Sequence, residues 1–320
     1  MKMRELALLA GVSVSSVSKA FSGSREISID TKERIIKIAK ETGCYEKYSK
    51  KSFSKKVIAV VCYEFASGYY ANQLKFLERE IAKRGGIMIA STCNFDHRLG
   101  AELVRYYAEY LKADGIIIFG SRQLFKKYDV PIVVIGESEE YDSVWLSNER
   151  AIEDAVELFL EKGHKRIAFI GESLTESKSV QFINAMEKNG QTVNDEYIMN
   201  VPERFEEAGY KAMNHLLSLK NPPTAVLAAY DNIALGAMRS IRERGLKIPE
   251  DISIIGMDDI KECEYFDVPL TSVTSYIEDL CEIVADMIFA RIKSGKMGNP
   301  KKIKVSTELV KRGSVGECKK

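Results

Sequence analysis

The stretch SVSSVSK, Ser13–Lys19, carries residue types that could recognise a nucleic acid. Helical periodicity predicts that Val17, Ala20 and Phe21 face inward. The serine hydroxyls and the Lys19 ammonium are then left on the outer face. Small side chains let a helix backbone approach base edges, and hydroxyls can donate or accept hydrogen bonds there. This outer face therefore fits the major groove of DNA.

Residues for catalysis or metal binding do not form recognisable sets. The histidines at 97, 164 and 215 are scattered, and the six cysteines show neither C-x-x-C nor a metal-ligand spacing. The segment GESLTES lacks the spacing of a nucleophile elbow, and no glycine-rich phosphate loop is present. We expect a protein that is not an enzyme, with no cofactor, no metal and reduced cysteines.

Three short helices are expected to position the serine-lined stretch. Gly11 ends the first helix, Ser13 caps the second, and the third begins at Ser28 or Asp30 and ends at Gly43. The tight turn between the first two helices predicts a helix-turn-helix. A plain three-helix bundle with solvated serines is the alternative. The residues predicted to face inward from the first and third helices are Leu6, Leu9, Ala10, Ile35, Ile36 and Ala39.

Charge is distributed unevenly along the chain, although the net charge is only +1. Residues 1–56 hold 13 Lys and Arg against 6 Asp and Glu, whereas the remainder holds 34 against 40. A basic end on a mildly acidic body indicates a polyanionic partner, or else a merely solvated N-terminus. Glu5 and the serines interrupt the short apolar core that a signal peptide would need, so we expect a cytoplasmic protein without a membrane segment.

The runs LALLAGVSVSSVSKAFSGS and REISIDTKERIIKIAKETG resemble the start of LacI/GalR-type transcriptional regulators, lactose-repressor-like proteins. The resemblance implies that Val14, Ser15 and Lys19 face base edges. It also implies that Ser13, Ser16 and Ser18 lie near the DNA backbone. Positive side chains that can neutralise phosphates in this region include Arg4, Arg25, Lys32, Lys47, Lys50 and Lys51.

The segment CYEKYSKKSFSKK at 44–56 corresponds in that family to a hinge helix that wedges an apolar side chain into the minor groove. The aligned residue is Phe53. The segment departs from the family pattern, because its usual proline is missing and Lys50 replaces a small alanine. A basic, flexible linker is the alternative to a hinge helix.

Short apolar runs alternate with amphipathic helices over the rest of the chain, in two successive series. Nearly all-apolar strands indicate sheets buried on both faces, and therefore parallel sheets. The expected fold is an N-terminal all-α helix-turn-helix head followed by an α/β core of two doubly wound parallel-sheet lobes. Ligands of such sheets bind at the carboxyl ends of the strands, where two facing lobes make a cleft.

The family resemblance extends over residues 3–315 and implies a core that is similar to periplasmic sugar-binding proteins. We expect a DNA-binding domain at 1–47, a hinge or linker at 48–56, and an effector-binding core at 57–320. The resemblance implies that the chain crosses to the first lobe near Tyr276 and returns near Lys302. Lobe 1 would then comprise about 57–147 and 277–301, and lobe 2 about 148–276 and 302–315.

The resemblance also places six residues at an effector site between the lobes. Lys178 stands where sugar-binding members have an arginine, and Ser147 begins a pair that replaces an Asp-Asn pair. Tyrosines can stack on a sugar or base ring, while Asp258 and Lys178 can bind hydroxyls. The expected effector-binding residues are Tyr69, Tyr70, Ser147, Lys178, Tyr230 and Asp258.

Together these features predict a sequence-specific DNA-binding regulator, a repressor of a sugar or metabolite utilisation operon. Its partners would be a pseudo-palindromic operator, a small molecule such as a sugar derivative, and a second copy of the chain. One alternative is a solute-binding protein of the transport type. Another is a regulator of the same family that has lost small-molecule sensing and responds to a protein partner.

Overall fold

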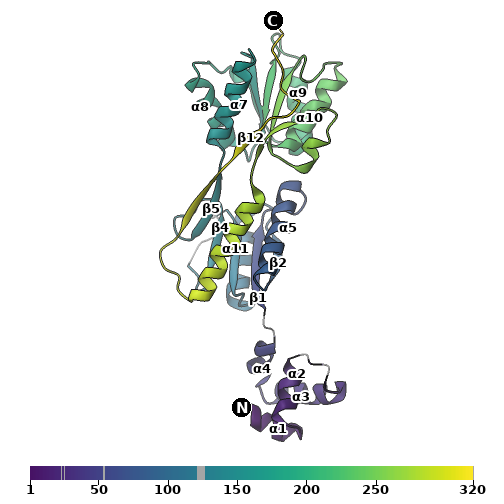
Figure 1. Ribbon diagram of the computed structural model, residues 1–320, viewed down its shortest axis with the longest axis vertical. Coiled ribbons are helices and arrows are strands. Elements are labelled where there is room, and N and C mark those ends of the chain that lie inside the picture. The colour runs from purple at the N-terminus through teal and green to yellow at the C-terminus, as the bar shows by residue number, and fades with distance from the viewer. Residues whose placement is uncertain (23, 25, 53–54, 121–126, 320) are drawn as a thin grey trace. The chain divides into compact units, whose positions relative to one another are not determined.

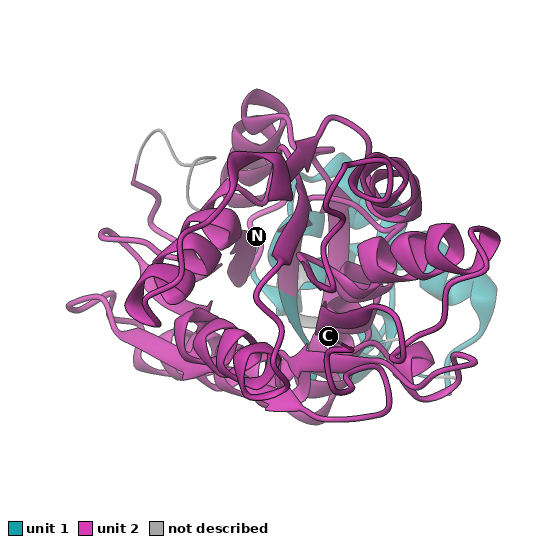
Figure 2. Ribbon diagram, turned by 90° about the horizontal axis from the view of Figure 1, so that it is seen from above, with its two compact units in different colours: residues 1–57, 85–87 teal, residues 58–84, 88–320 magenta. Residues whose placement is uncertain are grey.

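The computed structural model describes residues 1–22, 24, 26–52, 55–120 and 127–319. The chain forms two compact units, which Figure 2 shows in different colours. The first unit comprises residues 1–57 and 85–87, and the second comprises residues 58–84 and 88–320. We call the helical part of the first unit the head and the second unit the core. None of the helices within the described ranges is long and apolar enough to span a bilayer.

The head contains four helices, α1 to α4 (Figure 1). Gly11 ends α1 with φ of 62°, a left-handed conformation that glycine adopts without strain. The Ser13 hydroxyl accepts the backbone N–H of Ser16 and caps α2, as predicted. The bounds are α1 Met3–Ala10, α2 Val14–Phe21, α3 Ile29–Glu41 and α4 Tyr45–Ser52.

The inward faces of the head helices agree with the sequence pattern except at Leu9 and at Ile36, which is only half-buried and lies outside the apolar cluster of the head. Val17, Ala20 and Phe21 of α2 are buried, and so are Leu6, Ala7 and Ala10 of α1 and Ile35 and Ala39 of α3. Leu9 is 55% exposed, so its expected inward orientation is wrong. The residues at 6, 7 and 10 follow the i, i+1, i+4 pattern of a narrow helical stripe, and Leu9 lies outside it.

Helix α4 packs against the rest of the head. Tyr48 is only 4% exposed, its ring lies 5.7 Å from that of Phe21, and its hydroxyl donates to the Met1 carbonyl at 2.8 Å. The linker expected to begin at residue 48 therefore starts later, because Tyr48 belongs to the apolar core of the head. The flexible-linker alternative is wrong for the backbone of residues 45–52, which is helical.

Lobe 1 of the core contains a six-stranded sheet in the order β11-β5-β4-β3-β1-β2. Consecutive residues of β1 point to opposite faces, so Ile58 and Val60 join one apolar cluster while Ala59 and Val61 join another. The strands are β1 Lys56–Cys62, β2 Gly86–Thr92, β3 Gly115–Phe119, β4 Ile132–Ile135, β5 Asp142–Ser147 and β11 Lys302–Ser306. The helices are α5 Gly68–Lys83, α6 His97–Arg105 with a π-helical continuation Tyr106–Tyr110, and α11 Ile277–Ser294.

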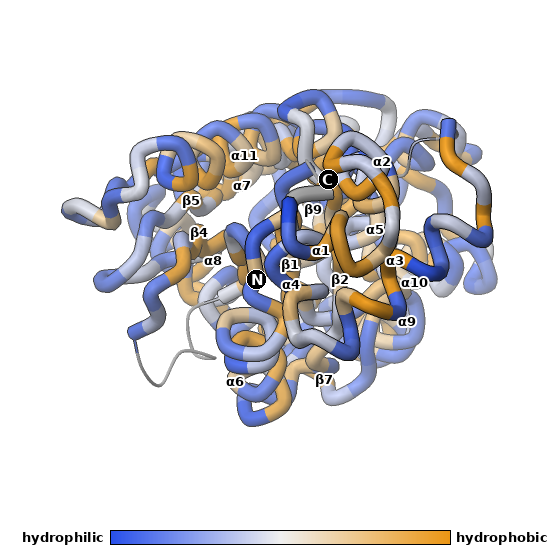
Figure 3. Tube along the Cα trace, turned by 90° about the horizontal axis from the view of Figure 1, so that it is seen from below, coloured by the Kyte–Doolittle hydropathy of each residue, from blue (hydrophilic) through white to orange (hydrophobic). Residues whose placement is uncertain are grey.

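Lobe 2 repeats this architecture with a sheet in the order β12-β10-β9-β8-β6-β7. Its strand pairs are parallel as predicted, except that β12 runs antiparallel to β10. The strands are β6 Ile167–Glu172, β7 Ile198–Val201, β8 Ala225–Ala228, β9 Ser253–Asp258, β10 Thr271–Thr274 and β12 Glu308–Val310. The helices are α7 Glu149–Glu161, α8 Glu176–Lys188, α9 Phe205–Leu216 and α10 Asp231–Glu243. Helices such as α7 and α11 alternate between apolar and polar residues along the chain, as amphipathic helices do (Figure 3).

The chain passes between the lobes three times: after β5, between β10 and α11, and between β11 and β12. The expected return near Lys302 is wrong, because Lys302–Ser306 pairs in parallel with β5 and forms the edge strand of lobe 1. Its alternate residues Ile303 and Val305 pack on the lobe 1 core. The return lies at Thr307, whose N–H and hydroxyl both donate to the Ser147 carbonyl in the neighbouring crossing.

Two glycines bring α9 and α10 unusually close together. A Cβ at Gly209 would collide with the Ile233 carbonyl, and a Cβ at Gly236 would collide with the Glu206 carbonyl. The N-terminal ends of these helices therefore lie side by side, where they carry Arg204 and Tyr230 at their caps.

Replacing Gly236 with alanine should destabilise the core. Alanine in a helix is ordinarily more stable than glycine by up to about 1 kcal/mol. Here the methyl group would force α9 and α10 apart, and overpacking typically costs roughly 1–3 kcal/mol. Urea unfolding of Gly236→Ala should show that loss. Gly68→Ala is the matched control, because nothing lies within 4 Å of its added Cβ. A Gly236→Ala protein as stable as the control would contradict the close-packing argument.

Candidate functional site

The outer face of α2 exposes the side chains that the sequence analysis assigned to DNA. Val14, Ser15 and Ser18 are exposed, and Lys19 is half-buried. The Ser13 and Ser16 hydroxyls lie 2.9 Å apart, and Ser13 also accepts the Ser16 N–H at 3.0 Å. These two serines therefore stabilise the first turn of α2 while they remain at the surface. The arrangement leaves a small, polar helix start that can approach a base edge.

Lys19 has an acidic partner in the head. Its ammonium lies 2.6 Å from a carboxylate oxygen of Glu26, whose side chain is largely exposed. The hydrogen bond from Lys19 and its positive charge lower the pKa of the Glu26 carboxyl. Lys19 can reach a base only after this pair separates. No sequence pattern indicated Glu26, because it follows α2 by five residues in a turn.

The structure does not describe the side chains of four residues that were predicted to contact DNA. Arg25 and Phe53 lie outside the described residues. Lys50 and Lys51 belong to the helical backbone of α4, and the structure does not describe their side chains.

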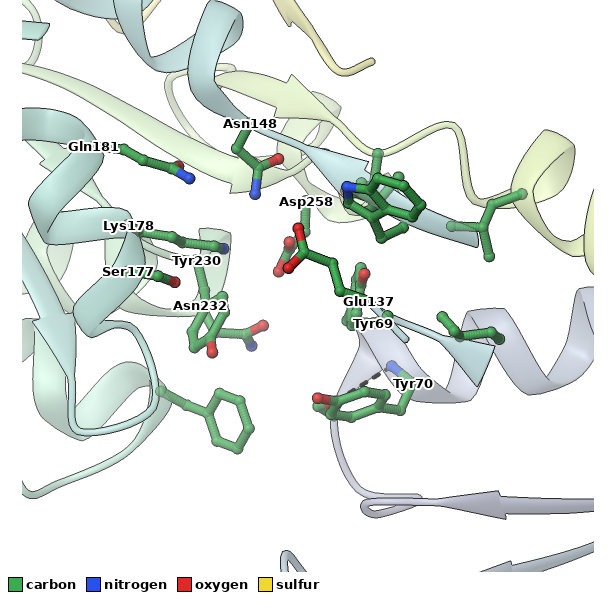
Figure 4. Close-up of a pocket in the computed structure, with 18 of the residues that line it drawn as sticks. Tyr69, Tyr70, Glu137, Asn148, Ser177, Lys178, Gln181, Tyr230, Asn232 and Asp258 are labelled. Carbon is green, nitrogen blue, oxygen red and sulfur yellow. Dashed lines mark hydrogen bonds between the residues drawn. The ribbon is translucent and has the colours of Figure 1, made fainter. Parts of the chain in front are cut away.

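A cavity of about 460 Å³ lies between the two lobes of the core, at the carboxyl ends of their strands (Figure 4). Glu137 follows β4, Asn148 follows β5, Tyr230 follows β8, and Asp258 ends β9. The first turns of α5 and α8 contribute tyrosines from lobe 1 and Lys178 from lobe 2. This is the position at which open α/β sheets bind ligands.

Five of the six predicted effector residues line this cavity: Tyr69, Tyr70, Lys178, Tyr230 and Asp258. Ser147 does not line it. The Ser147 carbonyl accepts hydrogen bonds from Thr307 in the adjacent crossing, and the next residue, Asn148, reaches the cavity instead. The expected position is thus wrong by one residue, since β5 ends at Ser147 and the chain turns into α7 at Asn148.

Lys178 and Asp258 form the charged part of the lobe 2 wall. The Lys178 ammonium donates to the Ala229 carbonyl at 2.7 Å and lies 4.5 Å from the centre of the Tyr230 ring. Burial lowers the pKa of Lys178. The negative charges of nearby carboxylates oppose this shift, and Asp258 contributes the largest opposing effect. Burial raises the pKa of the Asp258 carboxyl to about 6, and the Lys178 charge opposes the rise. Asp258 also has φ of 104°, a strained backbone conformation of the kind found at functional sites.

Asp231 holds the loop that carries Asp258. Its fully buried carboxylate accepts the Ile260 N–H at 2.9 Å and the Ser272 hydroxyl at 2.6 Å. Burial raises the pKa of Asp231 to about 7, and the charge of Asp258 adds to the rise. In the adjacent pair Tyr230–Asp231, the tyrosine therefore lines the cavity and the aspartate fixes the backbone beside it.

Arg204 connects the two lobes at one side of the cavity. Its guanidinium lies 3.0 Å from Glu64 of lobe 1 and 3.0 Å from Glu172 of lobe 2. It is also positioned over the rings of Phe95, at 4.7 Å, and Phe205, at 4.2 Å. Sequence reasoning missed this bridge, because its members lie far apart in the chain and match no motif. Other cavity residues that it missed are Glu137, Trp145, Asn148, Ser177, Gln181 and Asn232.

Comparisons with known proteins match both parts of the chain. A family model described as "Bacterial regulatory proteins, lacI family" covers residues 2–45, and one described as "Periplasmic binding protein-like domain" covers residues 156–315. The chain belongs to the LacI family of bacterial regulatory proteins. As a member of this family it is a DNA-binding transcriptional repressor with a small-molecule-binding core. The match of the head leaves the transport-type alternative without support.

Individual LacI-family relatives are similar over nearly the whole chain. The HTH-type transcriptional repressor CytR of Escherichia coli K12 is 28% identical over 328 residues, covering 98% of this chain and 95% of the relative. The transcriptional regulator CelR, solved as a cellobiose complex, has a TM-score of 0.70 at 25% identity, covering 98% and 99% of the two chains. A LacI-family regulator from Enterococcus faecium with bound ribose has a TM-score of 0.72 at 25% identity, covering 82% of this chain and all of that one.

Glu26→Gln in this LacI-family head should strengthen DNA binding. The change frees the Lys19 ammonium and removes a carboxylate that phosphates would repel. We expect dissociation constants to fall by roughly 3- to 10-fold. Fluorescence anisotropy at fixed salt measures this. Glu33→Gln, which removes the same charge from the exposed side of α3, is the control. An equal gain from both variants would show that net charge alone is responsible.

Arg204→Gln should loosen the core. Glu172 is buried and would lose its counter-charge, and a broken pair of this kind costs several kcal/mol when fully buried. Because Arg204 is 30% exposed, we expect a smaller loss of roughly 1–3 kcal/mol in urea unfolding. Arg150→Gln, which breaks exposed pairs on α7, should cost less than about 1 kcal/mol. Equal losses in the two variants would contradict the structural importance of the Arg204 bridge.

Proposed function

We propose that this protein represses a sugar or metabolite utilisation operon. It binds a pseudo-palindromic operator as a homodimer through α2 of each head. A small molecule, a sugar or sugar derivative, binds in the cavity of the core and changes the affinity for the operator. One observation supports the proposal most strongly. The same chain contains a LacI-type head and a core cavity that is lined by residues at the carboxyl ends of the strands of both lobes.

The proposed DNA contacts follow from the exposed face of α2. Val14, Ser15 and Lys19 read base edges. The backbone is held by Ser13, Ser16, Ser18, Arg25, Lys50 and Lys51, and Phe53 enters the minor groove. A single head offers few base contacts, so two heads related by a two-fold axis are needed for specificity. In this proposal the head, α4 included, carries base recognition, and the core forms the sensor.

The proposed sugar effector is supported by the cavity and by two similar proteins. The structures of CelR and of the Enterococcus faecium regulator are described as bound to cellobiose and to ribose. The cavity of this protein combines aromatic rings with polar groups, as sugar sites do. Such a lining also favours small-molecule sensing over a regulator that has lost its effector.

The proposed homodimer has a candidate surface on lobe 2. Tyr265 is 73% exposed there, beside a hollow of about 560 Å³ that Leu235, Met238 and Phe266 also line. A second copy of the chain placed on this surface would bury these apolar groups by two-fold symmetry. The protein acts by binding rather than by catalysis, and it acts in the cytoplasm, where its DNA is.

Lys19→Ala tests the assignment of α2. Loss of a base contact should reduce the preference for the operator over other duplexes by roughly 1–3 kcal/mol, while binding to non-specific DNA changes little. The operator is first identified by enrichment of genomic fragments on the purified protein, and affinities are then measured on it and on a scrambled duplex. Lys37→Ala on the exposed side of α3 is the control. Uniform weakening on both duplexes would assign Lys19 to a phosphate instead.

A further inference from the structure

Two carboxylates point into the cavity from opposite lobes. Asp258 projects from the end of β9 in lobe 2, and Glu137 lines the cavity from the loop after β4 in lobe 1 (Figure 4). Among the residues that the structure describes, no side chain or backbone group forms a hydrogen bond or an ion pair with either carboxylate. Both are therefore available to a ligand in the space between them.

The two cations of the cavity wall are already engaged by the protein. Lys178 donates to the Ala229 carbonyl and lies over the Tyr230 ring. Arg204 is paired with two carboxylates, those of Glu64 and Glu172. Arg204 thus carries one positive charge against two negative charges and offers no surplus to an anionic ligand.

The two charged groups of the cavity wall that have no protein partner are therefore both negative. The charged residues that line the cavity are Lys178, Arg204, Glu137 and Asp258, and the two partners of Arg204 neutralise it without being part of the lining. Asp258 is half-buried and Glu137 is exposed, so water screens the charge of Asp258 less than that of Glu137. A phosphate or carboxylate on the ligand would meet net repulsion, whereas a protonated amine would meet attraction.

The uncharged part of the wall favours the same kind of ligand. The Gln181 side chain has a buried carbonyl oxygen with no hydrogen-bond partner, so it can accept a bond from a ligand N–H or O–H. The rings of Tyr69, Tyr230 and Trp145 line the cavity, and aromatic faces attract cations and the C–H faces of sugars.

We propose that the effector is a sugar that carries a protonated amine, bound with its amine between Asp258 and Glu137. Gln181 accepts a hydrogen bond from the same ligand, and the tyrosine rings cover its apolar faces. This inference rests on the proposed function of the cavity as the effector site. It restricts the effector to positively charged ligands. Phosphorylated sugars and sugar acids are excluded as effectors.

Calorimetric titration of the full-length protein with two matched sets of probes tests the inference. One set is glucosamine, glucose and glucose 6-phosphate, and the other is galactosamine, galactose and galactose 6-phosphate. In at least one set, the amine should bind at least ~10-fold more tightly than the neutral sugar, which corresponds to about 1.4 kcal/mol. The phosphate of that set should show no binding.

Glu137→Gln should reduce the ratio of amine to neutral-sugar affinity several-fold, because one of the two carboxylates is lost. Glu140→Gln, an exposed change in the same loop outside the cavity wall, should leave that ratio unchanged. A phosphate that binds more tightly than its neutral parent would overturn the inference. So would an amine preference that Glu137→Gln does not alter.

A separate measurement distinguishes failure of this inference from failure of the proposed function. The small-molecule fraction of a cell extract is added to the complex of protein and operator. If that fraction changes operator affinity while neither amine binds, the amine assignment is overturned and the effector function stands. If neither the fraction nor any of the six probes has an effect, both are overturned.

Discussion

The arrangement of the two lobes of the core depends on the ion pairs that the Arg204 guanidinium forms. This guanidinium joins Glu64 of one lobe to Glu172 of the other and is flanked by Phe95 and Phe205. The chain crossings near Ser147 and Thr307 connect the same two lobes covalently. The cavity exists only while the lobes face each other in this way, since its wall is drawn from both. A ligand that changes the lobe arrangement must therefore act on the Arg204 bridge.

Close local packing in lobe 2 fixes the positions of the polar groups that line the cavity. Close contact of α9 with α10 at Gly209 and Gly236 fixes the helix starts that carry Arg204 and Tyr230. The buried Asp231 carboxylate holds the backbone next to Asp258 through two hydrogen bonds. Such supports keep the site pre-organised, so that the free energy of ligand binding can be used to shift the lobes rather than to order side chains.

Periodicity and family resemblance predicted the two lobes, the N-cap of α2 and five of the residues that line the cavity, because these features are encoded locally. Errors arose where tertiary context decides. Lys302–Ser306 alternates polar and apolar residues, and only its pairing with β5 assigns it to lobe 1. Ser147 ends β5 and Asn148 begins the turn into α7, and the sequence does not reveal which of the two neighbours reaches the cavity. Glu26 and Glu137 lie in a turn and a loop, and Arg204 pairs with residues that are distant in the chain, so no spacing identifies the three.

The central claim is that occupancy of the core cavity controls the affinity of the head for one DNA sequence. The most direct measurement is an anisotropy titration of the protein's own promoter duplex and a scrambled duplex, with and without the small-molecule fraction of a cell extract. The account predicts that the promoter duplex binds at least ~10³-fold more tightly than the scrambled one, and that the fraction changes this affinity. Equal binding to both duplexes, unaltered by the fraction, would contradict it.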